Sequence, residues 1–425
     1  MGFFIPEGKG DGRLELLAAI TVLMGKVLLN AFTSPMFIII YLLLLAIVAW
    51  QYRRLEDMTR SLCNYSRNRY LHSALISASL GILGGLLGSI LLIFIGIDLS
   101  HLGIMYLWLI AVLLMLVNPR FLCFAYAGGI LSLISLAVGY PDINIAQLMG
   151  LIAVLHMVES MLILLNGRAT PIPVYLKSGQ SLRGGFNIQY FWPIPLIILM
   201  AGGAADPAAG VSMPDWWPLI KDYAAFDYGR NYSLLPVLAV LGYGEISSTH
   251  VPEQRIKKSA SNLFGFSMIL LLLAILSSHW EQFTLIAALF SPLGHEFVIW
   301  LGMREERNRQ PIYVNPPRGI MVLEVMKASL ASRSGIRSRD TILSINGEPV
   351  NDMGAVQQFL NSGFRELELE ILREGQRLLL QLTRRPCQEL GIIPVPDKAT
   401  ARYLLLNEDG FWGFTRRMGR RFKKR

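Results

Sequence analysis

Long apolar runs, separated by short charged loops, constrain this chain more than any other feature of its sequence. Of its 425 residues, 53% are hydrophobic and only 16% are charged, whereas soluble domains carry roughly 25% charged residues. The runs lie in the first 300 residues. A helix needs about 20 mostly apolar residues to cross a bilayer. The sequence therefore predicts an integral membrane protein.

The predicted fold is an α-helical polytopic membrane bundle of about 8–10 spans, followed by a small α+β domain. The count is a range because the first candidate contains Glu15 and Lys26 and could lie in the membrane interface instead of crossing it. The candidate after FNIQYFWPIP is short. The ten candidates lie near residues 14–30, 35–52, 74–97, 102–117, 121–140, 145–165, 190–203, 232–248, 262–278 and 283–303.

The charges of the short loops predict the orientation. Lysine and arginine dominate the loops at 51–73, 166–189 and 249–261, whereas aspartate dominates 203–231. Because cytoplasmic loops carry the excess of basic residues, we expect the basic loops inside the cell and the acidic loop outside. The last span then runs inward. Everything after it, including the C-terminus, is predicted to be cytoplasmic in a multi-pass plasma-membrane protein.

After residue 316 the sequence changes to alternating strand patterns separated by Gly, Asn and Asp turns. RGIMVLEV (318–325) predicts a strand, MGAVQQFLNSG (353–363) a short helix, and two further strands meet at Glu374-Gly375. The stretch SGIRSRDTILSINGEPV resembles a bacterial PDZ domain, with Arg339 where the family has glycine. The positions that carry this resemblance are Gly335, Ile336, Asp340, Asn346 and Gly347.

The predicted domains are a transmembrane domain at 1–310, a PDZ domain at 311–398 and a tail at 399–425. The tail stretch GFWGFTRRMGRRFKKR combines basic and aromatic residues, which favours binding to an anionic lipid surface. A disordered, solubilising end is the alternative. The chain has no recognisable nucleic-acid-binding fold, so we expect no nucleic-acid partner.

A PDZ domain binds an extended peptide along a sheet edge and captures its terminal carboxylate with loop amides. Two loops are candidates for that site. Leu390, Gly391 and Ile392 form the Leu-Gly-Ile-X-Pro pattern that closes permuted bacterial PDZ domains, and Gly319-Ile320 is the competitor. Both glycines could also be simple turn residues. The first loop is the favoured peptide-binding site.

The pair His295-Glu296 lies in the last apolar run and resembles the start of a zinc-protease motif. A second histidine is needed at i+4, but that position is Ile299 and no later span follows. His156 and Glu159 are spaced to share a helix face and supply two ligands at most. Three widely spaced cysteines predict neither a disulfide framework nor a zinc-cysteine site. We therefore expect no metal, no cofactor and no catalytic residue.

The order of a polytopic region followed by one PDZ domain resembles the MinJ family of cell-division topology factors. ELLAAITVLMGKVLLNAFTSPMF, FNIQYFWPIP and SPLGHEF…PIYVNPPRGIMVLEV carry this resemblance. It implies a non-enzymatic scaffold at septa and poles that links a DivIVA-like landmark protein to a MinD-like division inhibitor. The alternative is a PDZ-containing intramembrane protease of the site-2 type, or an adaptor for one.

Overall fold

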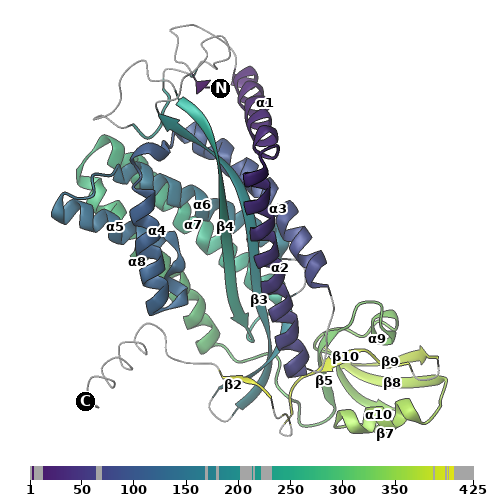
Figure 1. The fold of residues 1–425 in the computed structure, drawn as a ribbon. Coiled ribbons are helices and arrows are strands. Elements are labelled where there is room, and N and C mark those ends of the chain that lie inside the picture. The colour runs from purple at the N-terminus through teal and green to yellow at the C-terminus, as the bar shows by residue number, and fades with distance from the viewer. Residues whose placement is uncertain are drawn as a thin grey trace.

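Two parts make up the structure, a computed structural model: a long helical bundle and a smaller β-rich domain at one of its ends (Figure 1). The tail at 410–425 and most of the acidic loop lie outside the described residues. The described residues are 2–3, 13–63, 69–167, 171–178, 181–201, 213, 216–221, 232–385, 388–397, 400 and 402–405.

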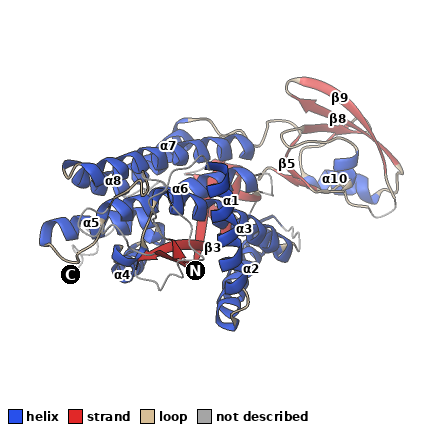
Figure 2. Ribbon diagram, turned by 90° about the horizontal axis from the view of Figure 1, so that it is seen from above, coloured by secondary structure: helices blue, strands red, loops and turns tan. Residues whose placement is uncertain are grey.

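Helices occupy eight of the ten predicted spans (Figure 2). Within the described residues, five are long and apolar enough to cross a membrane, namely α2, α3, α6, α7 and α8. The chain is thus a multi-pass membrane protein. The eight helices are α1 (Arg13–Ala31), α2 (Pro35–Cys63), α3 (Tyr70–Ile95), α4 (Ile104–Val117), α5 (Phe124–Val138), α6 (Ile145–Asn166), α7 (Pro252–His279) and α8 (Gln282–Asn308), with 3-10 turns η1 (Leu99–His101) and η2 (Pro119–Leu122).

The predicted spans at 190–203 and 232–248 are wrong, because these segments are strands. They belong to β3 (Ser181–Ala201) and β4 (Tyr232–Ser247), which pair antiparallel without interruption from Phe186↔Ser247 to Ala201↔Tyr232. Hydropathy does not separate a buried strand from a helix, but prolines at 193 and 195 disfavour a helix interior. The sheet order is β1 (Gly2–Phe3), β4, β3, β2 (Ile172–Ser178) and β11 (Leu404–Leu405).

Non-helical backbone at membrane depth must be covered by protein, and the edge of β3 beyond β2 meets this requirement at five of its outward-facing positions. Outward-facing positions alternate along the strand. Tyr52 Oη accepts from the N–H of Phe191 at 3.3 Å, and Ser89 Oγ accepts from that of Ile197 at 2.8 Å. Ala201 donates to Asp98 Oδ1 at 3.1 Å. Residues 193 and 195, between these, are prolines and have no N–H to satisfy.

Helix α3 covers that same edge through a glycine face. A methyl group on Gly81 would lie 2.2 Å from the carbonyl oxygen of Pro193, and one on Gly85 would lie 2.2 Å from that of Pro195. A methyl on Gly84 would instead meet Leu162 of α6 at 2.9 Å. Glycine is therefore required here for close packing of a helix against a strand, rather than for backbone flexibility.

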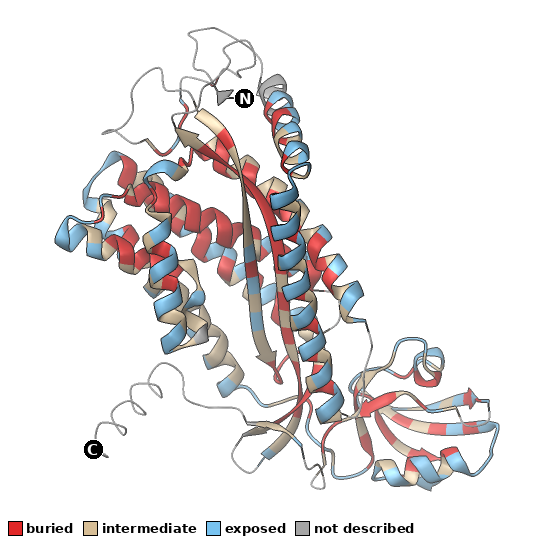
Figure 3. Ribbon diagram, viewed as in Figure 1, coloured by how far each residue is buried: buried red, intermediate tan, exposed pale blue. Residues whose placement is uncertain are grey.

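Helix α6 lies at the centre of the bundle, and most of its side chains are buried (Figure 3). It is hydrophobic on all faces, as expected for a helix surrounded by others. Its residues and those of β3 share one apolar core, which includes the buried Trp192. By contrast, α2 and α4 expose many large apolar side chains, such as Leu42 and Leu109, which suits contact with lipid.

The smaller domain contains a six-stranded antiparallel sheet and two short helices. Its strand order is β10, β5, β6, β8 and β9, with β7 beside β6. Its core is formed by 16 buried apolar residues, distinct from the core of the bundle. The elements are β5 (Ile320–Val325), α9 (Leu330–Arg333), β6 (Thr341–Ile345), β7 (Glu348–Pro349), α10 (Met353–Asn361), β8 (Glu366–Arg373), β9 (Gln376–Thr383) and β10 (Ile392–Pro394).

An apolar junction joins this domain to the end of the β3 hairpin. Tyr175 and Phe186 of the membrane-region sheet pack with Tyr313 and with Ile393 of β10. The N–H of Gly184 donates to the carbonyl of Tyr313 at 2.8 Å. Burial raises the pKa of the Tyr313 phenol, so this residue stays neutral. The junction is a packed interface in addition to a covalent linker.

Candidate functional site

The favoured loop, Leu390-Gly391-Ile392, leads directly into edge strand β10. Leu390 and Ile392 point into the domain core, where they cluster with Val356 and Leu360 of α10. Gly391 has a φ of +76°, and a methyl group on it would lie 2.3 Å from Ser329 Cβ. Both the positive φ and the close approach require glycine. The loop thus lies where the edge strand and helix α10 share one apolar cluster.

The backbone of β10 has a donor on its outer edge at one position. Met326 donates to the carbonyl of Gly391, and Ile392 lies opposite Val325, so this is a non-hydrogen-bonded pair whose Ile392 N–H faces away from β5. Two residues later, Pro394 has no N–H, and its carbonyl already accepts from Tyr175 Oη at 3.1 Å. The edge therefore suits a short peptide end rather than a long added strand.

The competing loop is engaged differently. The N–H of Gly319 donates to Asn351 Oδ1 at 3.0 Å. A methyl on Gly319, whose φ is +83°, would lie 2.5 Å from the carbonyl oxygen of Ile342. Its neighbour Ile320 begins β5 and pairs with Ile342. Gly319 and Ile320 thus form a turn inside the sheet, which leaves Gly391 as the stronger candidate for carboxylate capture.

The other predicted signature residues have structural positions. Asp340, of which 1% is exposed, accepts two hydrogen bonds from the Arg373 guanidinium, at 2.8 and 2.6 Å, and one from the Arg337 N–H at 2.7 Å. Arg373 also donates to the carbonyl of Gly335 at 2.6 Å. The hydrogen bonds to Asp340 raise the pKa of Arg373. Ile336 is buried in the core.

Asn346 and Gly347 form the turn between β6 and β7, with φ values of +52° and +81°. Asn-Gly is the preferred pair for such a turn. Asn346 also joins β8, since its Oδ1 accepts from the Glu368 N–H at 2.8 Å. Arg339, which replaces the family's glycine, has a φ of +75°. The backbone therefore keeps a glycine-like conformation at a residue that disfavours it.

In the bundle, both residues of the pair His295-Glu296 contact the segment formed by η2 and the start of α5. Glu296 accepts from Arg120 Nη2 at 2.6 Å and from Tyr126 Oη at 2.6 Å. His295 faces the Tyr126 ring, with ring centroids 5.2 Å apart. This acid is thus held by an ion pair and a hydrogen bond that attach α8 to α5.

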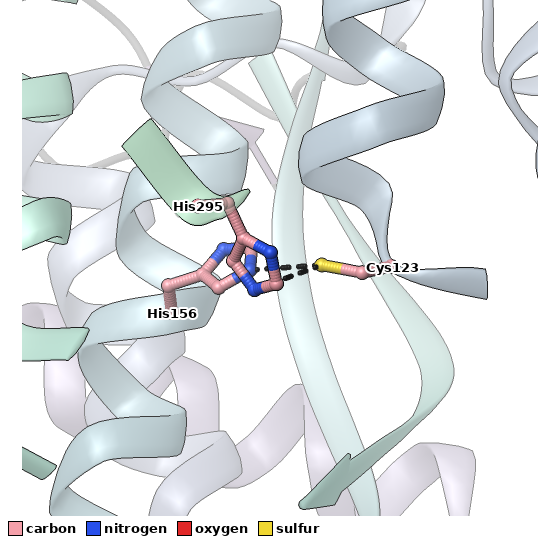
Figure 4. Close-up of side chains that lie close together, drawn as sticks. All are labelled: Cys123, His156 and His295. Atoms are coloured by element: carbon pink, nitrogen blue, oxygen red, sulfur yellow. Dashed lines mark hydrogen bonds between the residues drawn. The ribbon is translucent and has the colours of Figure 1, made fainter. Parts of the chain in front are cut away.

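His295 also meets two other potential metal ligands, Cys123 and His156 (Figure 4). Cys123 Sγ lies 3.1 Å from His156 Nε2 and 3.6 Å from His295 Nε2, and the three ligand atoms all lie within 4.8 Å of one another. The sequence motifs predicted two ligands at most, because His156 pairs only with Glu159 and position 299 is not a histidine. The signal they missed was Cys123, which is 33 residues from His156 and 172 from His295.

Glu245 on β4 joins the hairpin to α7 near the same end of the bundle as the small domain. Its carboxylate forms an ion pair with the buried Arg255 and accepts from Ser259 Oγ at 2.6 Å and from Tyr243 Oη at 2.6 Å. Every partner is a structural neighbour in the fold. These contacts attach β4 to α7.

His250, in the loop between β4 and α7, is held in its neutral form. The single hydroxyl proton of Thr249 is donated to Glu306 at 2.6 Å. The Thr249 oxygen must therefore accept the 2.9 Å hydrogen bond from His250, whose Nδ1 carries the proton. The other ring nitrogen then accepts from Arg309 at 2.8 Å. Burial lowers the pKa of His250, although the nearby Glu305 opposes this. These bonds connect the last turn of α8 to the end of β4.

Multiple apolar helices and a small domain with this strand order define a multi-pass membrane protein that carries one PDZ domain. Residues 321–373 match the PDZ-domain family model. The chain is similar to the "Cell division topological determinant MinJ" of Bacillus subtilis, with 23% identity over 248 residues, which cover 57% of this chain and 56% of that protein.

Two animal proteases match over a much shorter part. "Serine protease HTR4" of Rattus norvegicus and "Serine protease HTRA4" of Mus musculus are each 33% identical over 82 residues, or 19% of this chain. The aligned part covers 16% and 17% of these relatives. The similarity to MinJ is long enough to extend beyond the PDZ domain, whereas the similarity to the proteases is about as long as that domain. The matched part of this chain covers about half the length of MinJ and less than a fifth of each protease.

Proposed function

We propose that this protein is a membrane-anchored, non-enzymatic adaptor whose PDZ domain recruits partner proteins during bacterial cell division. The observation that carries the proposal is a PDZ domain packed on the end of a polytopic bundle, in a chain similar to a division topological determinant over 248 residues, which is longer than the PDZ domain alone. The partners are a DivIVA-like polar landmark and a MinD-like inhibitor. The PDZ domain lies in the cytoplasm, and the protein is enriched at septa and poles.

The geometry supports recognition of a free C-terminus. The N–H groups of Gly391 and Ile392 make no hydrogen bond within the described part of the chain, and the latter faces outward. Two adjacent amides are suited to bind a carboxylate, and hydrogen bonds to a charged group contribute roughly 1.5–3 kcal/mol each. Two residues after Ile392, Pro394 has no N–H and its carbonyl is already bonded to Tyr175, so a peptide cannot continue its backbone hydrogen bonds along β10. The ligand is therefore the last few residues of a partner.

Replacing Gly391 with alanine should weaken binding of a free C-terminus at least about 10-fold, because the added methyl pushes the loop away from Ser329 and misaligns the two amides. The measurement is a pull-down of displayed peptides by the purified full chain, followed by titration of the best binder. The same peptide with a C-terminal amide should also lose binding to the unmodified protein.

Gly363→Ala is the matched control. Gly363 lies in the same domain with a φ of +81°, yet a methyl there meets nothing within 4 Å. It carries the same backbone strain away from the loop, so it should bind peptide like the unmodified protein. Equal binding of the acid and amide peptides would contradict carboxylate capture at this loop.

A further inference from the structure

We propose that Cys123, His156 and His295 bind one Zn²⁺ ion inside the helical bundle. These residues come from the start of α5, from α6 and from α8 (Figure 4). One thiolate and two imidazoles are ligands that zinc prefers. This site is independent of the peptide-binding function, since it lies in the bundle and the peptide loop lies in the PDZ domain.

The distances between the ligand atoms fit a tetrahedral ion. With Zn–S near 2.3 Å and Zn–N near 2.0–2.1 Å, sulfur and nitrogen ligands lie about 3.6 Å apart. Cys123 Sγ lies 3.1 and 3.6 Å from the two Nε2 atoms. Both sulfur–nitrogen distances thus lie within about half an ångström of this spacing, and all three ligand atoms lie within 4.8 Å of one another. Small rotations of the side chains are sufficient to accept the ion.

The orientation of His156 is fixed by a second hydrogen bond. Its Nδ1 lies 2.7 Å from the carbonyl oxygen of Ile152. A carbonyl can only accept, so Nδ1 carries the proton and Nε2 presents its lone pair toward Cys123. Ligation through one ring nitrogen, with the other donating to a backbone carbonyl, is the usual arrangement for a zinc-bound histidine.

Aromatic side chains fix the orientation of His295. Its Nδ1 is buried and has no hydrogen-bond partner in the part of the chain that the structure describes, and its ring packs edge-on against Tyr126 and Phe266. Phe266 contacts His156 in the same way, with centroids 5.4 Å apart. Aromatic walls around three convergent ligands lower the local dielectric, which strengthens binding of a charged ion by its ligands.

The surrounding charges also suit a divalent cation. A Cys123 thiolate offsets one of the two positive charges, and Glu159 lies close enough to interact electrostatically with Cys123. Glu159 is one helical turn from His156 on α6, so it shares that face. The three ligands leave a fourth position for water. The ion would join α5, α6 and α8, and α8 leads to the PDZ domain.

The test is metal analysis of the purified full chain in detergent. We expect close to one zinc per chain, and a cobalt-substituted sample should show tetrahedral d–d bands with thiolate-to-cobalt charge transfer. Cys123→Ser and His295→Gln should each lower zinc affinity by more than about 100-fold. Cys63→Ser, the control, removes a half-buried cysteine outside the cluster and should leave zinc unchanged.

A stability readout separates loss of the site from loss of the fold. Added zinc should raise the melting temperature of the unmodified and Cys63→Ser proteins, because a ligand stabilises the state that binds it. It should not raise that of Cys123→Ser, even where this variant folds. Zinc content that is negligible in the unmodified protein, or unchanged by Cys123→Ser and His295→Gln, would overturn the proposal. Copper bound in place of zinc would overturn the choice of metal.

Discussion

Replacing Gly85 with alanine is expected to destabilise the membrane bundle by about 2 kcal/mol or more, because overpacking a close contact typically costs 1–3 kcal/mol. The methyl group would lie 2.2 Å from the carbonyl oxygen of Pro195. That carbonyl belongs to a strand paired with β4 along 16 positions, so it has little freedom to retreat. Gly81→Ala should act in the same way through Pro193, and the double variant should lose the native bundle.

The control is Gly265→Ala in α7. This glycine also lies in an apolar helix, but a methyl there meets nothing within 4 Å. Alanine is a better helix former than glycine by up to about 1 kcal/mol, so this variant should be neutral or slightly stabilised. The measurement is thermal unfolding of each protein in the same detergent. If Gly85→Ala and Gly265→Ala had the same melting temperature, the packing of α3 on β3 would be refuted.

Replacing Arg373 with alanine is the second change with a large expected effect. It leaves the carboxylate of Asp340, of which 2% is exposed, without its bidentate partner. Removing one member of a buried pair typically costs 3–5 kcal/mol. Because 21% of the Arg373 side chain is exposed, we expect about 3 kcal/mol. Faster hydrogen exchange in β6 and β8 of the full chain should report this loss.

Arg377→Ala provides the comparison within the same sheet. Arg377 forms an ion pair with Glu370 at 2.9 Å, but 74% of its side chain is exposed. Exposed pairs contribute about 0–1 kcal/mol, so exchange in β6 and β8 should barely change. The paired variant Asp340→Leu with Arg373→Met should recover part of the stability lost by Arg373→Ala. Similar exchange in the two single arginine variants would argue against a special role for the Asp340 contact.

Local patterns predicted the elements that depend on local physics. Eight apolar segments became helices, although α2 ends at Cys63 instead of residue 52 and α7 begins at Pro252 instead of residue 262. The small domain followed its turn residues closely, as Asn346-Gly347 illustrates. Gly347, the second residue of that turn, has the positive φ that favours glycine. In each case the information lies within a few neighbouring residues.

The hairpin was missed because burial on both faces removes the alternation that identifies a strand. The side chains of β3 pack into two apolar clusters shared with the helices, and nearly every residue from Phe186 to Leu199 is apolar or buried. The available evidence was the proline pair at 193 and 195. Helix-breaking residues at those two positions outweigh a high hydropathy.

The Cys123 cluster was missed for a different reason. Its members share no motif, and they converge only because α5 and α6 pack against α8 in three dimensions. Sequence analysis can exclude HExxH from Ile299, but it cannot exclude a set of ligands assembled from distant segments.

Fluorescence microscopy of the full chain fused to a fluorescent protein, in dividing cells of its own bacterial host, tests the adaptor role most directly. The proposed function predicts fluorescence concentrated at septa and poles, together with loss of partner recruitment to these places in the Gly391→Ala variant but not in Gly363→Ala. Uniform membrane fluorescence, or recruitment that does not depend on Gly391, would contradict it.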